Sequence, residues 1–194
     1  MHRCLLTAVL AGLATCCVAA EPVNRLPKPK YHFEASDPAW LPQAVQFHGH
    51  LGPWAAAGLR AGMAGLRAVE AEGYFDIEVV AEGPFVKPPI SCFLDGLQVS
   101  TGATWGKRNL DWVKKDTDDF VVRVENTRTG KTADVRPTPA LMKLLTSFKP
   151  KPLTGKPAKD LDDDHAGGDD PLEAIARKIA TLPEKELLAV GGRR

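Results

Sequence analysis

Two histidines and one cysteine are the residues of this sequence best suited to chemistry. His48 and His50 flank Gly49 directly before a glycine-rich segment, and Cys92 opens a later segment. Imidazole and thiolate are the ligands that zinc prefers, and two histidines one residue apart can face one ion where glycine lets the backbone turn. In a metal-free alternative, Cys92 is a nucleophile and His48 or His50 is its base. In a structural alternative, Cys92 is a small buried hydrophobic residue.

Further polar residues follow Cys92 at helical spacing. Asp95 and Gln98 lie three and six residues after it, so a helix over 91–101 would place all three on one side. The stretch 101–109 then combines glycines, hydroxyl groups and cations, which can cradle a small anion through backbone N–H groups and Lys107. The same composition is explained equally well by a turn with an unusual backbone conformation that leads into a following strand. No Walker loop is present, because the glycine spacing and Arg108 do not fit one.

The first twenty residues have the pattern of an export signal. A basic start precedes an apolar run that ends in small residues, Val18-Ala19-Ala20. We therefore expect cleavage near Glu21 and a mature protein in the periplasm or outside the cell, with lipidation at Cys16 as an alternative. Cys92 is then the single cysteine of the mature chain, so no intrachain disulfide forms, and its thiol is expected to be buried, metal-bound or reactive.

Charge and hydropathy exclude two classes of partner. Without residues 1–20 the chain has 24 basic and 24 acidic residues, so nucleic acid is not an expected partner. No later segment approaches the roughly 20 apolar residues of a spanning helix, so we expect no membrane span in the mature chain.

The elements that must position these side chains form one domain. We expect a proline-rich extended lead-in over 21–38, a domain over 39–190, a flexible Pro/Asp-rich linker over 149–170 within it, and a C-terminal helix over 171–190 with a break at Pro183. Helices are predicted over 53–72, 91–101 and 139–148, and strands over 74–81, 120–126 and 132–136.

One face of the predicted helix over 53–72 is almost without side chains. Gly58, Ala61, Gly62 and Gly65 recur at helical spacing. Each glycine costs a helix up to about 1 kcal/mol relative to alanine. Another element must therefore approach this face closely and offset that cost by packing.

Several fragments together resemble the E-type formylmethanofuran dehydrogenase family. They are FHGHLGP at 47–53, GLRAG at 58–62, CFLDGLQ at 92–98, STGATWGKRNL at 100–110 and the terminal IARKIATLPEKELLAV. Their order and combination are far more specific than any one of them. The resemblance implies an α+β domain with a small mixed or antiparallel sheet packed with helices, usually paired as a homodimer.

The resemblance also implies a site. A metal, typically zinc or another divalent transition metal, would be held by His48, His50 and Cys92. Asp95 would lie beside it, and a small-molecule or anion pocket would be lined by Gln98, Thr101, Gly102, Gly106, Lys107 and Asn109. If the protein is an enzyme, Cys92, Asp95 and Lys107 are the catalytic candidates. A binding module for a small anion or metal complex is the non-catalytic alternative.

The sequence departs from the family pattern at three places. Relatives often have cysteine at the positions of Gly52 and Ala103, and many carry a C-terminal cysteine-rich zinc ribbon, whereas this sequence has no cysteine after Cys92. Loss of two thiols favours a mixed nitrogen and sulfur site suited to zinc. The family name does not imply dehydrogenase activity here, because molybdenum or tungsten chemistry and its other protein components are not part of this chain.

Overall fold

The structure is a computed structural model that describes residues 26–147 and 171–193. The predicted export signal over 1–20 and the linker over 149–170 lie outside the described residues. Among those that are described, no helix is both long enough and apolar enough to cross a membrane.

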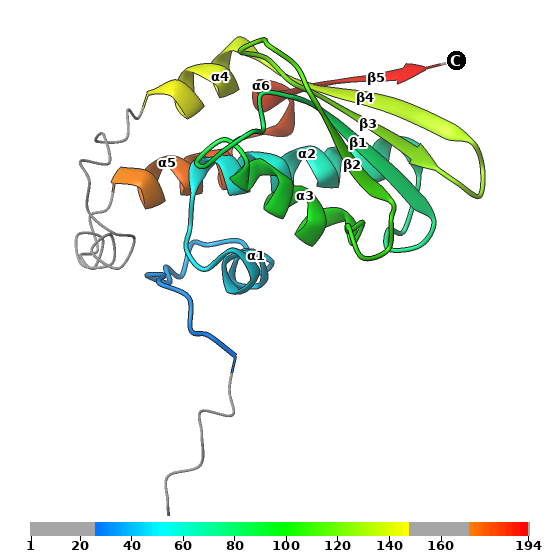
Figure 1. Cartoon of the computed structure of the whole chain (residues 1–194). Helices are drawn as coiled ribbons and strands as arrows, with labels where there is room; N and C mark the ends of the chain where they lie inside the picture. The colour runs from blue at the N-terminus through cyan, green and yellow to red at the C-terminus, as the bar shows by residue number, and fades with distance from the viewer. Residues whose placement is uncertain (1–25, 148–170, 194) are drawn as a thin grey trace, which may run out of the picture.

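A five-stranded mixed sheet forms one layer of the domain (Figure 1). Its strands are β1 (Ile77–Gly83), β2 (Leu110–Lys114), β3 (Val121–Asn126), β4 (Lys131–Pro137) and β5 (Leu188–Arg193), in the spatial order β2-β1-β3-β4-β5. The β1–β2 pair is parallel and the other pairs are antiparallel. Alternate residues of β1 are buried, as expected for a sheet with one face against helices. The prediction of an α+β fold with a small mixed sheet is confirmed.

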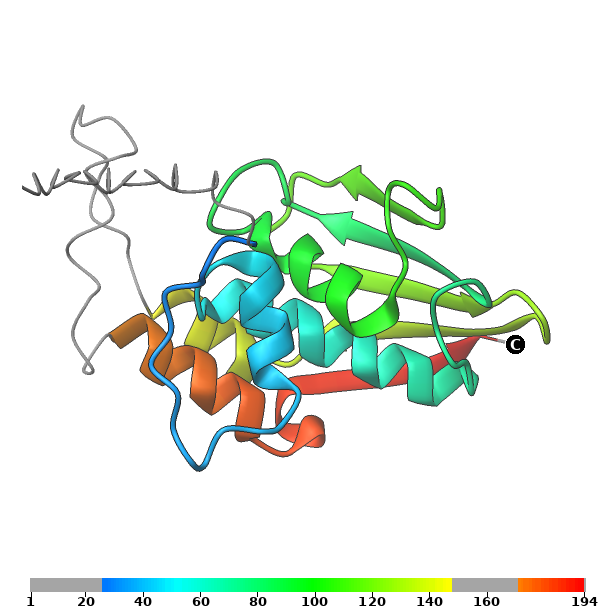
Figure 2. The same cartoon turned by 90° about the horizontal axis from the view of Figure 1, so that it is seen from below.

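Helices cover one face of this sheet. They are α1 (Leu41–His48), α2 (Pro53–Val69), α3 (Cys92–Thr101), α4 (Pro139–Thr146), α5 (Pro171–Thr181) and α6 (Glu184–Leu187). Helix α2 lies against the sheet between α3 and α5, and α1 lies further out, beneath them (Figures 1 and 2). The core is built from buried aliphatic and aromatic side chains, among them Phe85, Phe93 and Val122. This layering places the end of α1 beside the start of α3.

The small-residue face of α2 is where α3 crosses it. A Cβ atom added at Gly58 would lie 1.9 Å from the Phe93 carbonyl oxygen, and one added at Gly96 would lie 2.1 Å from the Ala55 carbonyl oxygen. The two helix backbones are therefore in direct contact. At Gly65 an added Cβ would instead meet the Val124 side chain of β3. The predicted close approach to this face is confirmed.

The chain differs from the sequence expectations mainly at element ends. Helix α2 ends at Val69, before the predicted 72, because Glu70 takes a left-handed φ of 55°. Strand β1 begins at Ile77 and not at 74, since Tyr74 has a φ of 63°. The strand β2 follows the 101–109 turn, and α1, which was not predicted, ends at the first histidine of the pair.

The predicted C-terminal helix over 171–190 is wrong in its last part. Helix α5 ends at Thr181, Pro183 precedes the single turn of α6, and Leu188 enters β5. Strand β5 pairs antiparallel with β4 over Pro137 to Thr132. Strand β5 pairs with the backbone N–H and C=O groups on the open edge of β4, which a helical continuation would leave without partners. This long-range gain overrides the local helical spacing.

The N-terminal lead-in is extended but firmly attached. The guanidinium of Arg177 on α5 donates to Asp37 (2.9 Å) and pairs with Glu34 (3.0 Å), and the Tyr31 hydroxyl donates to Asp37. Figure 2 shows the lead-in running alongside α5 before it enters α1. Further back, the Lys30 N–H donates to the Gly49 carbonyl (2.7 Å), so the lead-in also holds the loop between the two histidines.

Candidate functional site

The loop that carries the two histidines joins α1 to α2. His48 is the last residue of α1, and Gly49 ends the helix in the left-handed region with a φ of 94°. The Gly49 N–H donates to the Val45 carbonyl at 2.8 Å. A side chain at this φ would be strained, so glycine is what allows the chain to leave the helix and bring His50 back beside His48.

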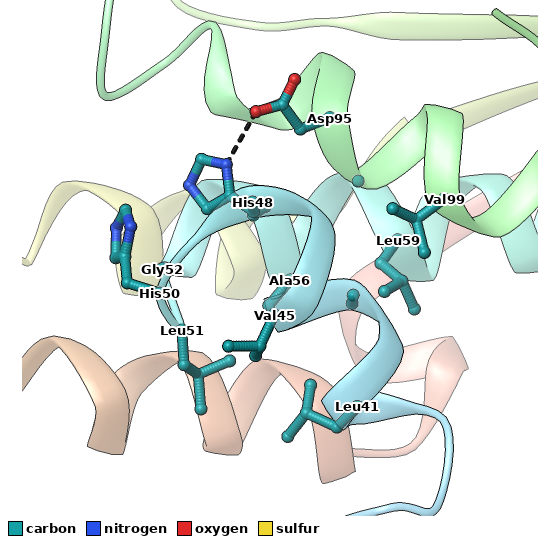
Figure 3. Close-up of a pocket in the computed structure, with 13 residues that line it drawn as sticks. Leu41, Val45, His48, His50, Leu51, Gly52, Ala56, Leu59, Asp95 and Val99 are labelled. Atoms are coloured by element: carbon teal, nitrogen blue, oxygen red, sulfur yellow. Dashed lines mark hydrogen bonds and ion pairs between the residues drawn. The ribbon is translucent and has the colours of Figure 1, made fainter. Parts of the chain in front are cut away.

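His48 is the buried centre of the site. Its side chain is 8% exposed, and its Nδ1 lies 2.7 Å from Oδ2 of Asp95 on α3 (Figure 3). The other ring nitrogen, Nε2, is buried and has no hydrogen-bond partner among residues 26–147 and 171–193. A buried polar atom without a partner is costly, so this nitrogen is suited to a ligand that the described residues do not supply.

The environment of His48 favours its protonated form in the absence of metal. Burial lowers the pKa of His48, but the hydrogen bond to Asp95, the interaction with Cys92 and the charges of both groups outweigh it and raise the pKa from 6.5 to about 9. The Cys92 side chain is therefore near enough to the His48 ring to affect its protonation. Asp95, one helical turn further along α3, reaches the same ring, as the predicted one-sided arrangement requires.

His50 lies against His48 on the exposed side of the site. The ring centroids are 4.5 Å apart with an interplanar angle of 39°. A Cβ atom added at Gly52 would lie 3.0 Å from Nε2 of His50 and 3.7 Å from Nε2 of His48. The two Nε2 atoms therefore face the same side of Gly52, and a larger residue there would occupy the space next to both.

A small apolar cavity adjoins the histidines between α1, α2 and α3. Its volume is about 10 Å³, roughly that of one water molecule. His48, His50 and Asp95 line one end, and Leu41, Val45, Leu59 and Val99 line the other (Figure 3). The space beside the metal candidates thus accommodates a water or a single small ligand atom, and nothing larger without movement.

The three predicted metal ligands are neighbours but do not form a closed site. His50 and Cys92 both lie close to His48. Nevertheless, within the described parts of the chain no group of three or more His, Cys, Asp or Glu side chains has the geometry to hold a metal ion. Metal binding by this set would require the His50 ring and the thiol to close around the ion.

The residues predicted to line a ligand pocket lie toward the other end of α3. None of Gln98, Thr101, Gly102, Gly106, Lys107 and Asn109 lines the cavity beside His48. Lys107 donates through Nζ to the Gly102 carbonyl (2.8 Å), where it caps the C-terminus of α3. The ligand-binding role of this set stays a prediction.

Asn109 and Ala103 have roles in the fold: Asn109 makes hydrogen bonds to the backbone, and Ala103 packs in the core. The Asn109 amide donates to the carbonyls of Tyr74 (2.7 Å) and Ile77 (2.9 Å) and accepts from the Thr104 N–H (3.0 Å). These bonds tie the 101–109 turn to the start of β1, which agrees with the alternative of a turn that leads into a following strand. Ala103 is fully buried in the core.

A comparison with protein-family models decides the family. Residues 47–189 match the model described as "FmdE, Molybdenum formylmethanofuran dehydrogenase operon". The chain belongs to the FmdE family. The matched region begins one residue before His48 and includes Cys92, Asp95 and most of the sheet. No protein of curated function matches the sequence.

Sequence reasoning grouped the candidate site residues but did not show which of them are bonded to each other. It placed Asp95 beside the metal candidates, yet it did not identify the hydrogen bond to His48. The missed signal was Gly96 next to Asp95: a glycine at that point lets α3 touch α2, and it thereby brings Asp95 within reach of the end of α1.

Proposed function

We propose that this FmdE-family protein is an exported metal-binding domain in which His48, His50 and Cys92 hold one zinc ion. The observation that carries the proposal is the buried Nε2 of His48, which has no partner in the described chain and faces the same side of Gly52 as Nε2 of His50. The Cys92 thiol, which is near enough to affect the pKa of His48, would supply the sulfur donor. Two imidazoles and one thiolate suit zinc and leave a fourth position for water or a small ligand.

Asp95 is proposed to orient the principal ligand. Its carboxylate accepts from Nδ1–H of His48, which fixes the ring and leaves Nε2 available to an ion. Such carboxylate partners of ligating histidines commonly contribute roughly 10- to 100-fold to metal affinity, and we expect the same order here. His48 must lose its second proton before it can bind an ion through Nε2.

The chemistry at this site would be centred on Asp95 and not on Lys107. Zinc, when bound, supplies a Lewis acid that polarises a ligand or acidifies bound water. Asp95 is 36% exposed and touches His48, so it is placed to carry a proton between the site and solvent. Lys107 instead donates to the end of α3. Export and a homodimeric state belong to the same proposal, on the strength of the N-terminal sequence and the family resemblance.

Metal analysis of the purified mature protein tests the site. We expect about one zinc per chain in wild type, and a large loss of bound zinc in His50→Ala and Cys92→Ser, since three ligands are the usual minimum for a stable protein zinc site. Plasma mass spectrometry after exhaustive dialysis measures the stoichiometry. His32→Ala is the matched control, because His32 lies on the lead-in and is expected to leave zinc content unchanged. Absence of zinc in metal-replete wild type, or undiminished zinc in both variants, would overturn the proposal.

A second candidate function is favoured by one specific observation. His48 is hydrogen-bonded to Asp95 and its pKa is affected by Cys92, so the three side chains follow one another in the order thiol, imidazole, carboxylate. This is the arrangement of a cysteine nucleophile whose base is oriented by an acid. In this interpretation the protein is a metal-free enzyme, and His50 does not belong to the catalytic triad.

Alkylation of Cys92 separates the two candidates. A thiolate paired with His48 is expected to react with iodoacetamide much faster than a free cysteine at neutral pH, and His48→Ala should slow the reaction by about tenfold or more. Stopped-flow or mass-spectrometric rates on chelator-treated protein measure this, with His50→Ala as the control that should retain the fast rate. A thiol that is equally slow in wild type and in His48→Ala would count against the enzyme hypothesis.

A further inference from the structure

A second, larger cavity lies away from the histidines. It is about 360 Å³ in volume and is bounded by the end of the lead-in, by α2, and by the segment that joins α5 to α6. This volume lies within the roughly 300–1,000 Å³ of small-molecule sites. Its lining includes Pro38, Trp40, Arg60, Met63, Arg67 and Glu184. No residue of the proposed metal site contributes to it.

Arg60 is the unusual residue of this cavity. Its Nη1 donates to the carbonyls of Ala180 (2.6 Å) and Ile179 (3.2 Å) at the C-terminal end of α5. Within 26–147 and 171–193, its Nε and Nη2 groups make no hydrogen bond, and no carboxylate forms an ion pair with it. Burial lowers the pKa of this guanidinium. Half-buried charges normally have a counter-ion, and here the helix carbonyls supply a partial one only.

The carboxylate that lines the same cavity is already engaged. Glu184 raises the pKa of Arg60 through its charge, but its carboxylate pairs with Arg67 on the cavity rim. The rim therefore carries two guanidinium groups and one carboxylate, a net positive charge. The Nε–H and Nη2–H groups of an arginine form a fork that matches a carboxylate in two parallel hydrogen bonds.

The remaining walls are apolar. Trp40, Met63 and Pro38 are half-buried and line the same space as Arg60. An indole ring and a thioether offer a large adaptable surface to an aliphatic or aromatic group. A cationic fork beside such walls selects a ligand with a single anionic head and an apolar body.

We propose that this cavity binds a small monocarboxylate with an apolar body, its carboxylate on Arg60 and its body against Trp40 and Met63. The site is separate from the metal centre and does not depend on the proposed function. A ligand bound here would contact the lead-in, α2 and α5 together and so would stabilise the lead-in. The lead-in also holds the histidine loop through the Lys30 N–H.

Titration calorimetry with phenylacetate tests the proposal on the mature chain. We expect saturable binding with a Kd on the order of 1 mM or tighter, and binding about tenfold or more weaker for phenylacetamide, which has the same shape without the charge. Arg60→Lys keeps a donor for the α5 carbonyls but lacks the fork, so it should weaken phenylacetate binding about tenfold. Met63→Trp should fill the cavity and abolish binding while leaving Arg60 in place.

Two controls make the result unambiguous. Arg136→Gln removes an exposed arginine of β4 that pairs with Asp134, and it should bind phenylacetate like wild type. Cys92→Ser should also bind normally, since the two sites share no residue. Circular dichroism confirms the fold of each variant. Equal binding of acid and amide, undiminished binding in both Arg60→Lys and Met63→Trp, or no binding in wild type would each overturn the proposal.

Discussion

Zinc affinity is expected to rise by at least about tenfold for each pH unit up to about pH 9, because the His48 proton must leave before the ion binds. The pKa of His48 is about 9 because Asp95 and Cys92 outweigh the effect of burial, so most metal-free molecules carry this proton at neutral pH. A zinc ion on Nε2 must displace it. Competition titrations with a chromophoric chelator across this pH range measure the slope, and an NMR titration of the metal-free protein locates the His48 midpoint.

Asp95→Asn is the matched variant for this prediction. It keeps the size of the side chain but removes the charge that raises the pKa of His48, so the NMR midpoint should fall toward 6.5. The rise of zinc affinity with pH should become less steep between neutral pH and pH 9, because the His48 proton then leaves at a lower pH. A zinc affinity in wild type that does not change between neutral pH and pH 9 would contradict the assignment of Nε2 as a ligand.

Loss of the His48 proton should strengthen zinc binding, but it should lower the stability of the metal-free protein. A histidine whose pKa is raised on folding stabilises the fold fully below its unfolded value, here 6.5, and that stabilisation is lost as the pH rises through about 9. Because the His48 side chain is only 8% exposed, its contribution is on the order of 2–3 kcal/mol. Metal-free and zinc-loaded protein should therefore show opposite trends of stability with pH in this range.

The core of the fold could be predicted from the sequence because its signals were local. The helix over 53–69 has proline at its start and a small-residue face, and the hairpin of β3 and β4 has Gly130 at its turn with a φ of 72°. Such signals depend on neighbours in the chain alone. His48, His50 and Cys92 are likewise candidates by residue type and spacing alone, and the structure brings His50 and Cys92 near His48.

The parts that sequence reasoning missed depend on distant partners. Strand β5 exists because β4 offers a free edge to it, and nothing near Leu188 indicates that edge. Helix α1 is short, and its buried side chains Leu41 and Val45 pack only once α2 and α3 are present. The hydrogen bond between His48 and Asp95 joins α1 to α3 across the packing of both on α2, so it could follow only from that packing.

Gly58→Ala is expected to destabilise the protein by about 3 kcal/mol or to prevent folding, although alanine favours a helix by about 1 kcal/mol over glycine. The added methyl group would lie 1.9 Å from the Phe93 carbonyl oxygen, which is backbone of α3 and cannot turn aside. Helix α3 would have to move away from α2. Cys92 and Asp95 would move with it, away from His48, so we expect zinc binding to weaken as well. Urea denaturation followed by circular dichroism measures the loss.

Two other glycines of the chain separate backbone contact from the general effect of adding a methyl group. Gly62→Ala meets the side chains of Ser100 and Thr101, which can partly rearrange, so its loss should be smaller than that of Gly58→Ala. Gly106→Ala meets nothing closer than 3.8 Å and should be nearly neutral. This ranking follows from what each methyl group would touch, and helix propensity alone would predict stabilisation at both Gly58 and Gly62. A Gly58→Ala protein as stable as wild type would mean that α2 and α3 do not cross at this point, and the placement of Cys92 and Asp95 beside His48 would fail with it.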